Sequence, residues 1–192
     1  MAGRNLAELN IKMYESASSS DSKPCIFISH ISIDKEAAEE ICEYIRYHGN
    51  VDVYFDKNDE ELQWAVQMDN AELITKMIEK GINRSSHVMC LVSDDTVRSW
   101  WVPYEIGFGK KGNKKISTLI LKDTDELPEY LEISTILKGT KSLNQYLRKM
   151  HGTLRTSIAT ESLSYDDVIH GEDTISHSDQ DHPLDEYLDW NS

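Results

Sequence analysis

The chain has 192 residues, a formal net charge of −14 and 39% hydrophobic residues, enough apolar material for one domain of ordinary size. The negative charge argues against nucleic acid or anionic lipid as a partner, because both bind through clustered Lys and Arg. No apolar run approaches the ~20 residues that span a bilayer, and no basic region precedes an apolar core at the N-terminus. We expect no membrane span, no signal peptide and a soluble cytoplasmic protein.

The acidity lies mostly at the C-terminal end. After Arg155 there is no Lys or Arg, whereas ten Asp and Glu follow. The composition predicts a lead-in over residues 1–22, a domain over 23–150 and an acidic tail over 151–192. The tail is typical of disorder, but it closes on a compact apolar end that could dock on a partner or on its own domain: Leu184, Tyr187, Leu188 and Trp190.

The cysteines and the tail histidines indicate no redox or metal centre. The cysteines lie in apolar stretches without a CxxC spacing, which predicts buried, reduced thiols of a cytosolic protein: Cys25, Cys42 and Cys90. Three tail histidines match no familiar zinc-ligand spacing, so we predict no metal site: His170, His177 and His182.

Strand and helix patterns alternate along the domain. Apolar runs rich in β-formers predict strands at 25–28, 51–55, 87–92 and 116–121. Helical spacing predicts helices at 33–45, 71–82, 100–108 and 142–150, with Asp34 as an N-cap, Gly81 closing the second helix and Pro103 in a first turn. This order predicts an α/β fold with a flavodoxin-like, doubly wound parallel sheet. The run 87–92 is the most continuously apolar and should lie near the centre.

Ligands of such sheets bind outside the carboxyl ends of the strands. That rule points to the loops 29–34, 56–70 and 93–98. Five motifs accompany these loops in chain order: Phe27-Ile28-Ser29-His30, Tyr54-Phe55-Asp56, Ile78-Glu79-Lys80-Gly81-Ile82, Val88-Met89-Cys90-Leu91-Val92-Ser93 and Ser99-Trp100-Trp101-Val102-Pro103-Tyr104-Glu105.

Together these motifs resemble TIR domains over residues 23–150. The last motif matches the family's Ser-x-Trp-x-x-x-Glu pattern, with Val102 where the family often has Cys. The resemblance is closest to bacterial TIR domains, including those of Thoeris anti-phage systems, in which the family makes ADP-ribose-derived signals. It implies cleavage of the nicotinamide–ribose bond of NAD, a substrate here, with no further cofactor.

The resemblance makes Glu105 the catalytic carboxylate, thought to contact the ribose. Trp101 is four residues earlier and shares a helix face with it, so its ring could stack on an adjacent ring of the substrate. Without the family pattern, the same pair reads as a core tryptophan and a solvated glutamate. One carboxylate is enough, because nicotinamide in NAD is already cationic and leaves without a proton.

Other substrate-binding candidates surround the same mouth. Ser29, His30, Ile31 and Ser32 would line it, although His30 could equally be part of a turn. Asp56 either meets the substrate or caps its loop. Glu79 matches an acidic position often found in bacterial TIR domains, and it could equally lie on a solvated helix face.

The segment Asp56–Asn70 matches the loop that TIR domains use for assembly, and it carries Trp64 and Met68 among charges. We expect a homo-oligomer through this loop and a downstream effector that senses the product. One alternative is a TIR domain that acts only as a scaffold. A receiver domain is disfavoured, because Ser29 and His30 stand where an acidic pair would bind Mg²⁺.

Overall fold

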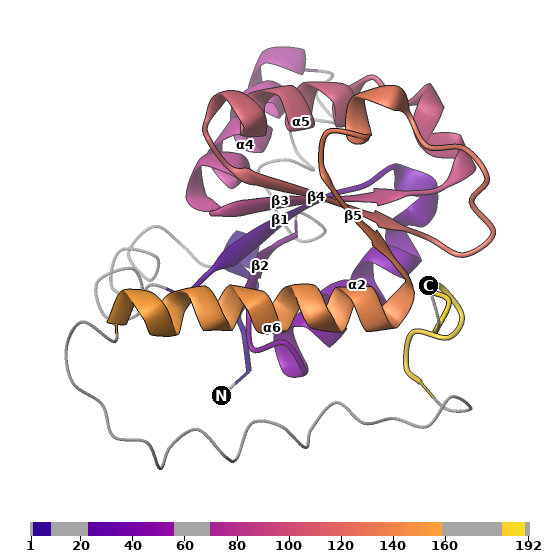
Figure 1. The fold of residues 1–192 in the computed structure, drawn as a ribbon. Helices are drawn as coiled ribbons and strands as arrows, with labels where there is room; N and C mark the ends of the chain where they lie inside the picture. Colours follow the sequence, from indigo (N-terminus) through magenta and orange to yellow (C-terminus); the bar gives the residue numbers. More distant parts are fainter. Residues whose placement is uncertain (1, 9–22, 56–69, 159–181, 191–192) are drawn as a thin grey trace, which may run out of the picture.

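The computed structural model describes residues 2–8, 23–55, 70–158 and 182–190 (Figure 1). The strands are β1 (Cys25–Ser29), β2 (Asp52–Tyr54), β3 (His87–Val92), β4 (Lys115–Ile120) and β5 (Thr135–Lys138). The helices are α2 (Lys35–Tyr47), α4 (Ala71–Arg84), α5 (Trp101–Lys111) and α6 (Gly139–Ile158). Short 3₁₀ turns are η1 (Leu6–Glu8), η2 (Ser32–Asp34), η4 (Asp94–Arg98) and η5 (Glu129–Leu131). None of the described helices is long and apolar enough to cross a bilayer.

The five strands form one parallel sheet in the order β2-β1-β3-β4-β5. The central position of β3 is as predicted, and all its residues are buried. The sequence interpretation missed β5, because the strand has four residues of which only Leu137 is buried. The last helix begins at Gly139 rather than Ser142 and continues to Ile158.

Helices cover both faces of the sheet, which confirms the doubly wound architecture (Figure 1). On one face, Ile26, Met89 and Leu119 pack with residues of α2 and α6, among them Ile41, Ile45, Leu143 and Leu147. On the other, Phe27, Val88 and Cys90 pack with residues of α4 and α5, among them Ile78, Ile82, Val102 and Ile106. Successive strand residues alternate between the two faces, as a pleated strand requires.

Gly81 has a packing role that differs from the expected one. Helix α4 starts where the Asn70 side chain accepts a hydrogen bond from the Leu73 N–H (3.0 Å), and it continues past Gly81 to Arg84. A Cβ atom at Gly81 would lie 2.6 Å from the Tyr54 ring and 2.9 Å from the Phe27 ring. The glycine therefore allows α4 to pack closely on β1 and β2 rather than ending the helix.

Residues near the N-terminus lie along the edge strand β2. The Val53 N–H donates to the Arg4 carbonyl (2.8 Å), and the Arg4 guanidinium pairs with the buried Asp52 carboxylate at 2.6 Å. A Cβ atom at Gly3 would lie 1.9 Å from the Val51 carbonyl oxygen. The close approach covers the open side of β2 with residues of the same chain.

The C-terminal residues pack on the α2–α6 face. Leu184 and Leu188 are fully buried in that core. The Lys122 N–H donates to the Tyr187 carbonyl and the Thr140 N–H to the Asp189 carbonyl, both at 2.8 Å. The apolar end therefore docks on its own domain, one of the two predicted outcomes.

Candidate active site

The site lies at the carboxyl ends of β1 and β3, where they meet the start of α5. Ser29 ends β1 and is in register with Cys90 of β3. The Ser99 hydroxyl accepts a hydrogen bond from the Val102 N–H (3.2 Å), so the motif serine fixes the start of α5. Val102 is fully buried, which explains why an apolar residue suits this position. Pro103 lies in the first turn of α5, as predicted.

Glu105 is held from β1. The Ser29 hydroxyl donates a hydrogen bond of 2.5 Å to Glu105 Oε2, and the two residues are 1% and 8% exposed. A short bond from a hydroxyl to a carboxylate is charge-assisted and fixes the carboxylate rotamer. Because water is largely excluded, the negative charge acts on a nearby cation more strongly than it would at the surface.

Cys90, predicted to be a buried, reduced thiol, and Tyr130, which the sequence interpretation missed, accompany this pair. Burial, and then the Glu105 charge, raise the pKa of the Cys90 thiol, so Cys90 is not a nucleophile at neutral pH. Burial, and then the nearby Cys90 and Glu105 side chains, raise the pKa of Tyr130 to about 12. Among the residues that the structure describes, the buried Tyr130 hydroxyl has no hydrogen-bond partner, and its raised pKa keeps it protonated and able to donate.

The predicted cap Asp34 has a different partner. It stands at the N-cap position of α2, but its side chain makes no cap hydrogen bond there. The carboxylate instead accepts a hydrogen bond of 2.7 Å from the Ser93 hydroxyl. Burial raises the pKa of Asp34, and the Ser93 bond opposes that shift. Asp34 therefore joins the loops that follow β1 and β3.

The other candidates from the first loop stand around Ser29. The half-buried His30 ring lies tilted against the Phe55 ring, with centroids 5.2 Å apart. Ile31 is half-buried against the α4–α5 core, whereas Ser32 is exposed. Asp56 and the segment 56–69, with the predicted assembly residues, lie outside the described residues.

Glu79 and Trp101 meet at Tyr104, the residue before Glu105. The Tyr104 hydroxyl donates to Glu79 Oε1 (2.6 Å), a bond that raises the pKa of Tyr104 to about 12. The Trp101 ring lies edge-on to the Tyr104 ring, with centroids 6.1 Å apart, and is 40% exposed. Trp101 is thus not a core tryptophan, and Glu79 ties α4 to α5 beside the site.

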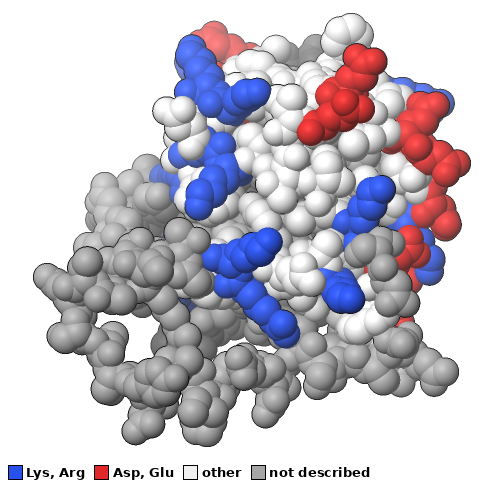
Figure 2. All heavy atoms as spheres, viewed as in Figure 1, with Lys and Arg blue, Asp and Glu red and all other residues white. Residues whose placement is uncertain are grey.

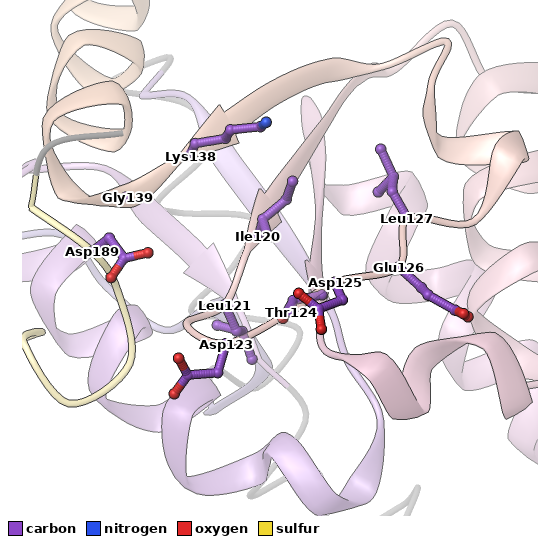
Figure 3. A pocket seen from close by; sticks show the side chains of 10 residues that line it. All are labelled: Ile120, Leu121, Asp123, Thr124, Asp125, Glu126, Leu127, Lys138, Gly139 and Asp189. Atoms are coloured by element: carbon purple, nitrogen blue, oxygen red, sulfur yellow. The ribbon is translucent and has the colours of Figure 1, made fainter.

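A cavity of about 410 Å³ lies further along the same edge of the sheet, at the ends of β4 and β5 (Figure 3). It contains none of the predicted site residues. Asp123 and Asp189 line one side and Glu126 and Leu127 another, and Lys138 of β5 completes the lining (Figure 3). In the described ranges no group of His, Cys, Asp and Glu could hold a metal ion.

Charged side chains on the face in Figure 2 stand in separate groups. Lys and Arg are interrupted by uncharged surface, and Asp and Glu gather along one edge. This face therefore offers no continuous basic patch of the kind that binds nucleic acid.

Comparisons with known proteins assign the family. The family model described as the TIR domain matches residues 26–149, well over half of the chain. No curated protein matches the chain. A solved structure, the TIR domain of the Toll-related receptor TRR-2 from Hydra magnipapillata, is 14% identical with a TM-score of 0.45, and the match covers 70% of this chain and 97% of that one. On the family match, the chain belongs to the TIR domain family.

Proposed function

We propose that this TIR domain cleaves the nicotinamide–ribose bond of NAD, with Glu105 as the catalytic carboxylate. The observation that carries the proposal is the buried Glu105 carboxylate, fixed by the Ser29 hydroxyl at the carboxyl end of the sheet. Doubly wound folds bind ligands at this edge.

One carboxylate is sufficient for this bond. When the bond between ribose C1′ and the pyridinium nitrogen breaks, its electron pair goes to the nitrogen, and nicotinamide leaves as a neutral molecule. No general acid is needed, unlike in ordinary glycoside cleavage, which uses two carboxylates. Positive charge develops at C1′, and a fixed, desolvated anion stabilises it. A water or hydroxyl group then adds to C1′ and loses its proton.

The surroundings of Glu105 support this role. The Ser29 hydroxyl holds the carboxylate in place before the reaction, which is the preorganisation that electrostatic catalysis requires. Tyr130 offers a buried hydroxyl that none of the described residues hydrogen-bonds. Leaving such a group unsatisfied costs about 1–3 kcal/mol, and a ribose hydroxyl or phosphate oxygen of a bound nucleotide would supply the missing acceptor.

We further propose that the product, or an ADP-ribose derivative of it, is a cytoplasmic signal read by an effector in bacterial anti-phage defence. The motif resemblance to Thoeris TIR domains supports this assignment, and homotypic assembly through Asp56–Asn70 would accompany it. The competing role is a scaffold without turnover. Three apolar side chains near the candidate site are exposed: Ile33, Val97 and Trp100. They favour the scaffold role, because exposed apolar side chains suit a contact between two copies of the chain.

Incubation of the full chain with NAD, followed by chromatography and mass spectrometry, distinguishes the two roles. The enzyme releases nicotinamide in an amount equal to the NAD consumed, together with an ADP-ribose product whose mass identifies the attacking group. A scaffold leaves NAD intact at every protein concentration, including concentrations at which the chain self-associates.

A further inference from the structure

The docked C-terminal segment, residues 182–190, begins with His182. The hydrogen bonds of this histidine define its protonation state. His182 is 4% exposed. Its Nδ1 accepts a hydrogen bond from the Leu184 N–H (3.1 Å), so Nδ1 carries no proton. Its Nε2 lies 3.1 Å from the Tyr44 hydroxyl oxygen, and that hydroxyl donates onward to Asn144 Oδ1 at 2.9 Å. Nε2 is therefore the donor, and the ring is neutral.

From these contacts we propose that residues 182–190 form a pH-sensitive clasp, docked on the α2–α6 face only while the His182 ring is neutral. Protonation would place a second N–H at Nδ1, directly opposite the Leu184 N–H. Protonation would therefore destabilise the docked state in two ways. The hydrogen bond between Leu184 and His182 would be lost, and the new positive charge would be buried away from water. The undocked segment avoids both costs.

Among the residues that the structure describes, titratable and charged groups near the ring come from α2, from α6 and from the segment itself. Helix α2 contributes Tyr44, whose pKa burial raises, and His48, whose ring stacks on Tyr44 with centroids 4.7 Å apart. Helix α6 contributes Asn144, already the acceptor for Tyr44, and the cation of Arg148, whose charge acts on Tyr44. Within the segment, the Asp185 carboxylate accepts from the His182 backbone N–H. It would attract an imidazolium but leaves the donor clash in place.

Undocking has consequences at both ends of the clasp. Leu184 and Leu188 would leave the core between α2 and α6, exposing an apolar groove. Asp189 would leave the wall of the 410 Å³ cavity, and its carbonyl would no longer accept the Thr140 N–H at the start of α6. Acidification would therefore open a groove and a cavity together, without unfolding the sheet.

The size of the effect follows from linkage. A solvent-exposed histidine gains its proton near pH 6.5, so the undocked segment binds a proton that the docked one excludes. Docking is then fully favoured above about pH 6.5 and weakens about tenfold for each unit below it. Between pH 7.5 and pH 5 the docking equilibrium constant should fall about 30-fold.

Hydrogen exchange of the full chain, corrected for the pH dependence of intrinsic exchange, tests the clasp. The reporters are the Lys122 and Thr140 N–H groups, which donate to the segment, and the Met89 N–H in the central strand serves as the control. We expect the two reporters to lose protection between pH 7.5 and 5 while Met89 keeps it. Equal reporter protection at both pH values would overturn the proposal.

The His182→Gln variant is the matched control. Its amide oxygen can accept the Leu184 N–H and its NH₂ can donate to Tyr44, but it does not titrate, so its reporters should stay protected at pH 5. Loss of their protection over the same pH range as in the wild type would overturn the proposal. If the variant is already undocked at pH 7.5, a titration of the wild-type His182 ring by NMR decides. Proton uptake coincident with undocking supports the clasp, and undocking without it refutes the clasp.

Discussion

At the residue scale, a few tertiary hydrogen bonds organise the site. Ser29 and Glu105 are 76 positions apart in the sequence, and their bond joins β1 to α5. Asp34 and Ser93, 59 positions apart, join the two neighbouring loops. Close to these residues lies the buried Tyr130 hydroxyl, which has no hydrogen-bond partner within the described part of the chain.

The Tyr130→Phe variant separates a binding role from a structural one. Because no described residue hydrogen-bonds this hydroxyl, its removal should leave the free energy of unfolding unchanged or raise it by about 1 kcal/mol. If the hydroxyl binds NAD, kcat/KM should fall about 3- to 10-fold, the range of one neutral hydrogen bond. Denaturant unfolding and initial-rate kinetics measure the two effects. A destabilised variant with normal kcat/KM would assign Tyr130 to the fold alone.

At the element scale, the central strand carries a second buried histidine. His87 begins β3, with Nδ1 2.8 Å from the Ser86 hydroxyl and its ring edge-on to Tyr146. Burial, and then the neighbouring Lys115, lower the pKa of His87 to about 4. The folded strand therefore favours the neutral ring, so acid lowers the free energy of unfolding.

Acid should destabilise the wild type more than His87→Gln. The unfolded state binds the histidine proton near pH 6.5 and the folded state only near pH 4, so stability is full above about pH 6.5 and is lost below it. By pH 5 the wild type should lose about 2 kcal/mol that the variant does not lose. Urea unfolding of both proteins at pH 7.5 and pH 5 gives the difference. Because His182 is present in both, its contribution cancels, and parallel pH dependences would contradict this account of His87.

At the scale of the whole molecule, both ends of the chain complete the domain. Residues 182–190 fill the α2–α6 face, and residues near the N-terminus cover the edge strand β2. The Arg4–Asp52 ion pair joins the N-terminal residues to that edge, with the Arg4 side chain 40% exposed and that of Asp52 3% exposed. Covering an edge strand in this way removes a template for pairing with other chains.

The Arg4→Ala variant should expose the dependence of β2 on the N-terminal residues. It leaves a buried carboxylate without its cation, and we expect a loss of about 2 kcal/mol, less than for a fully buried pair because Arg4 is partly solvated. In an Asp52→Asn background the same substitution should cost less than half as much. A double-mutant cycle by denaturant unfolding measures the coupling. Additive losses would show that the ion pair does not hold the N-terminal residues to β2.

We propose that the loop Asp56–Asn70 mediates weak self-association, with Trp64 as an apolar contact. Trp64→Ala should then reduce the apparent mass measured by light scattering, while the melting temperature stays near that of the wild type. A strict wild-type monomer under conditions of full turnover would count against assembly through this loop.

Much of the fold could be predicted because its signals are local. The run 87–92 and the helical spacing before Gly49 depend only on neighbouring residues, and both elements formed where expected. The missed strand β5 is short and only partly buried, so its pairing with β4 decides its structure. The motifs predict Glu105 and Ser29 as site residues, and the structure brings their side chains into a hydrogen bond. The partner of Asp34 and the position of Tyr130 depend on contacts distant in sequence, which no local pattern encodes.

The Glu105→Gln variant decides whether Glu105 is the catalytic carboxylate. Glutamine keeps the size of the side chain and an oxygen that can accept the Ser29 hydroxyl, but it removes the anion. NAD turnover by the full chain should fall ~10²–10³-fold, as expected for the loss of one preorganised electrostatic partner, while the melting temperature stays near that of the wild type. The control Glu72→Gln, on an exposed position of α4 paired with Lys76, should retain full turnover. Near-normal turnover by a folded Glu105→Gln variant would contradict the assignment of Glu105 as the catalytic carboxylate.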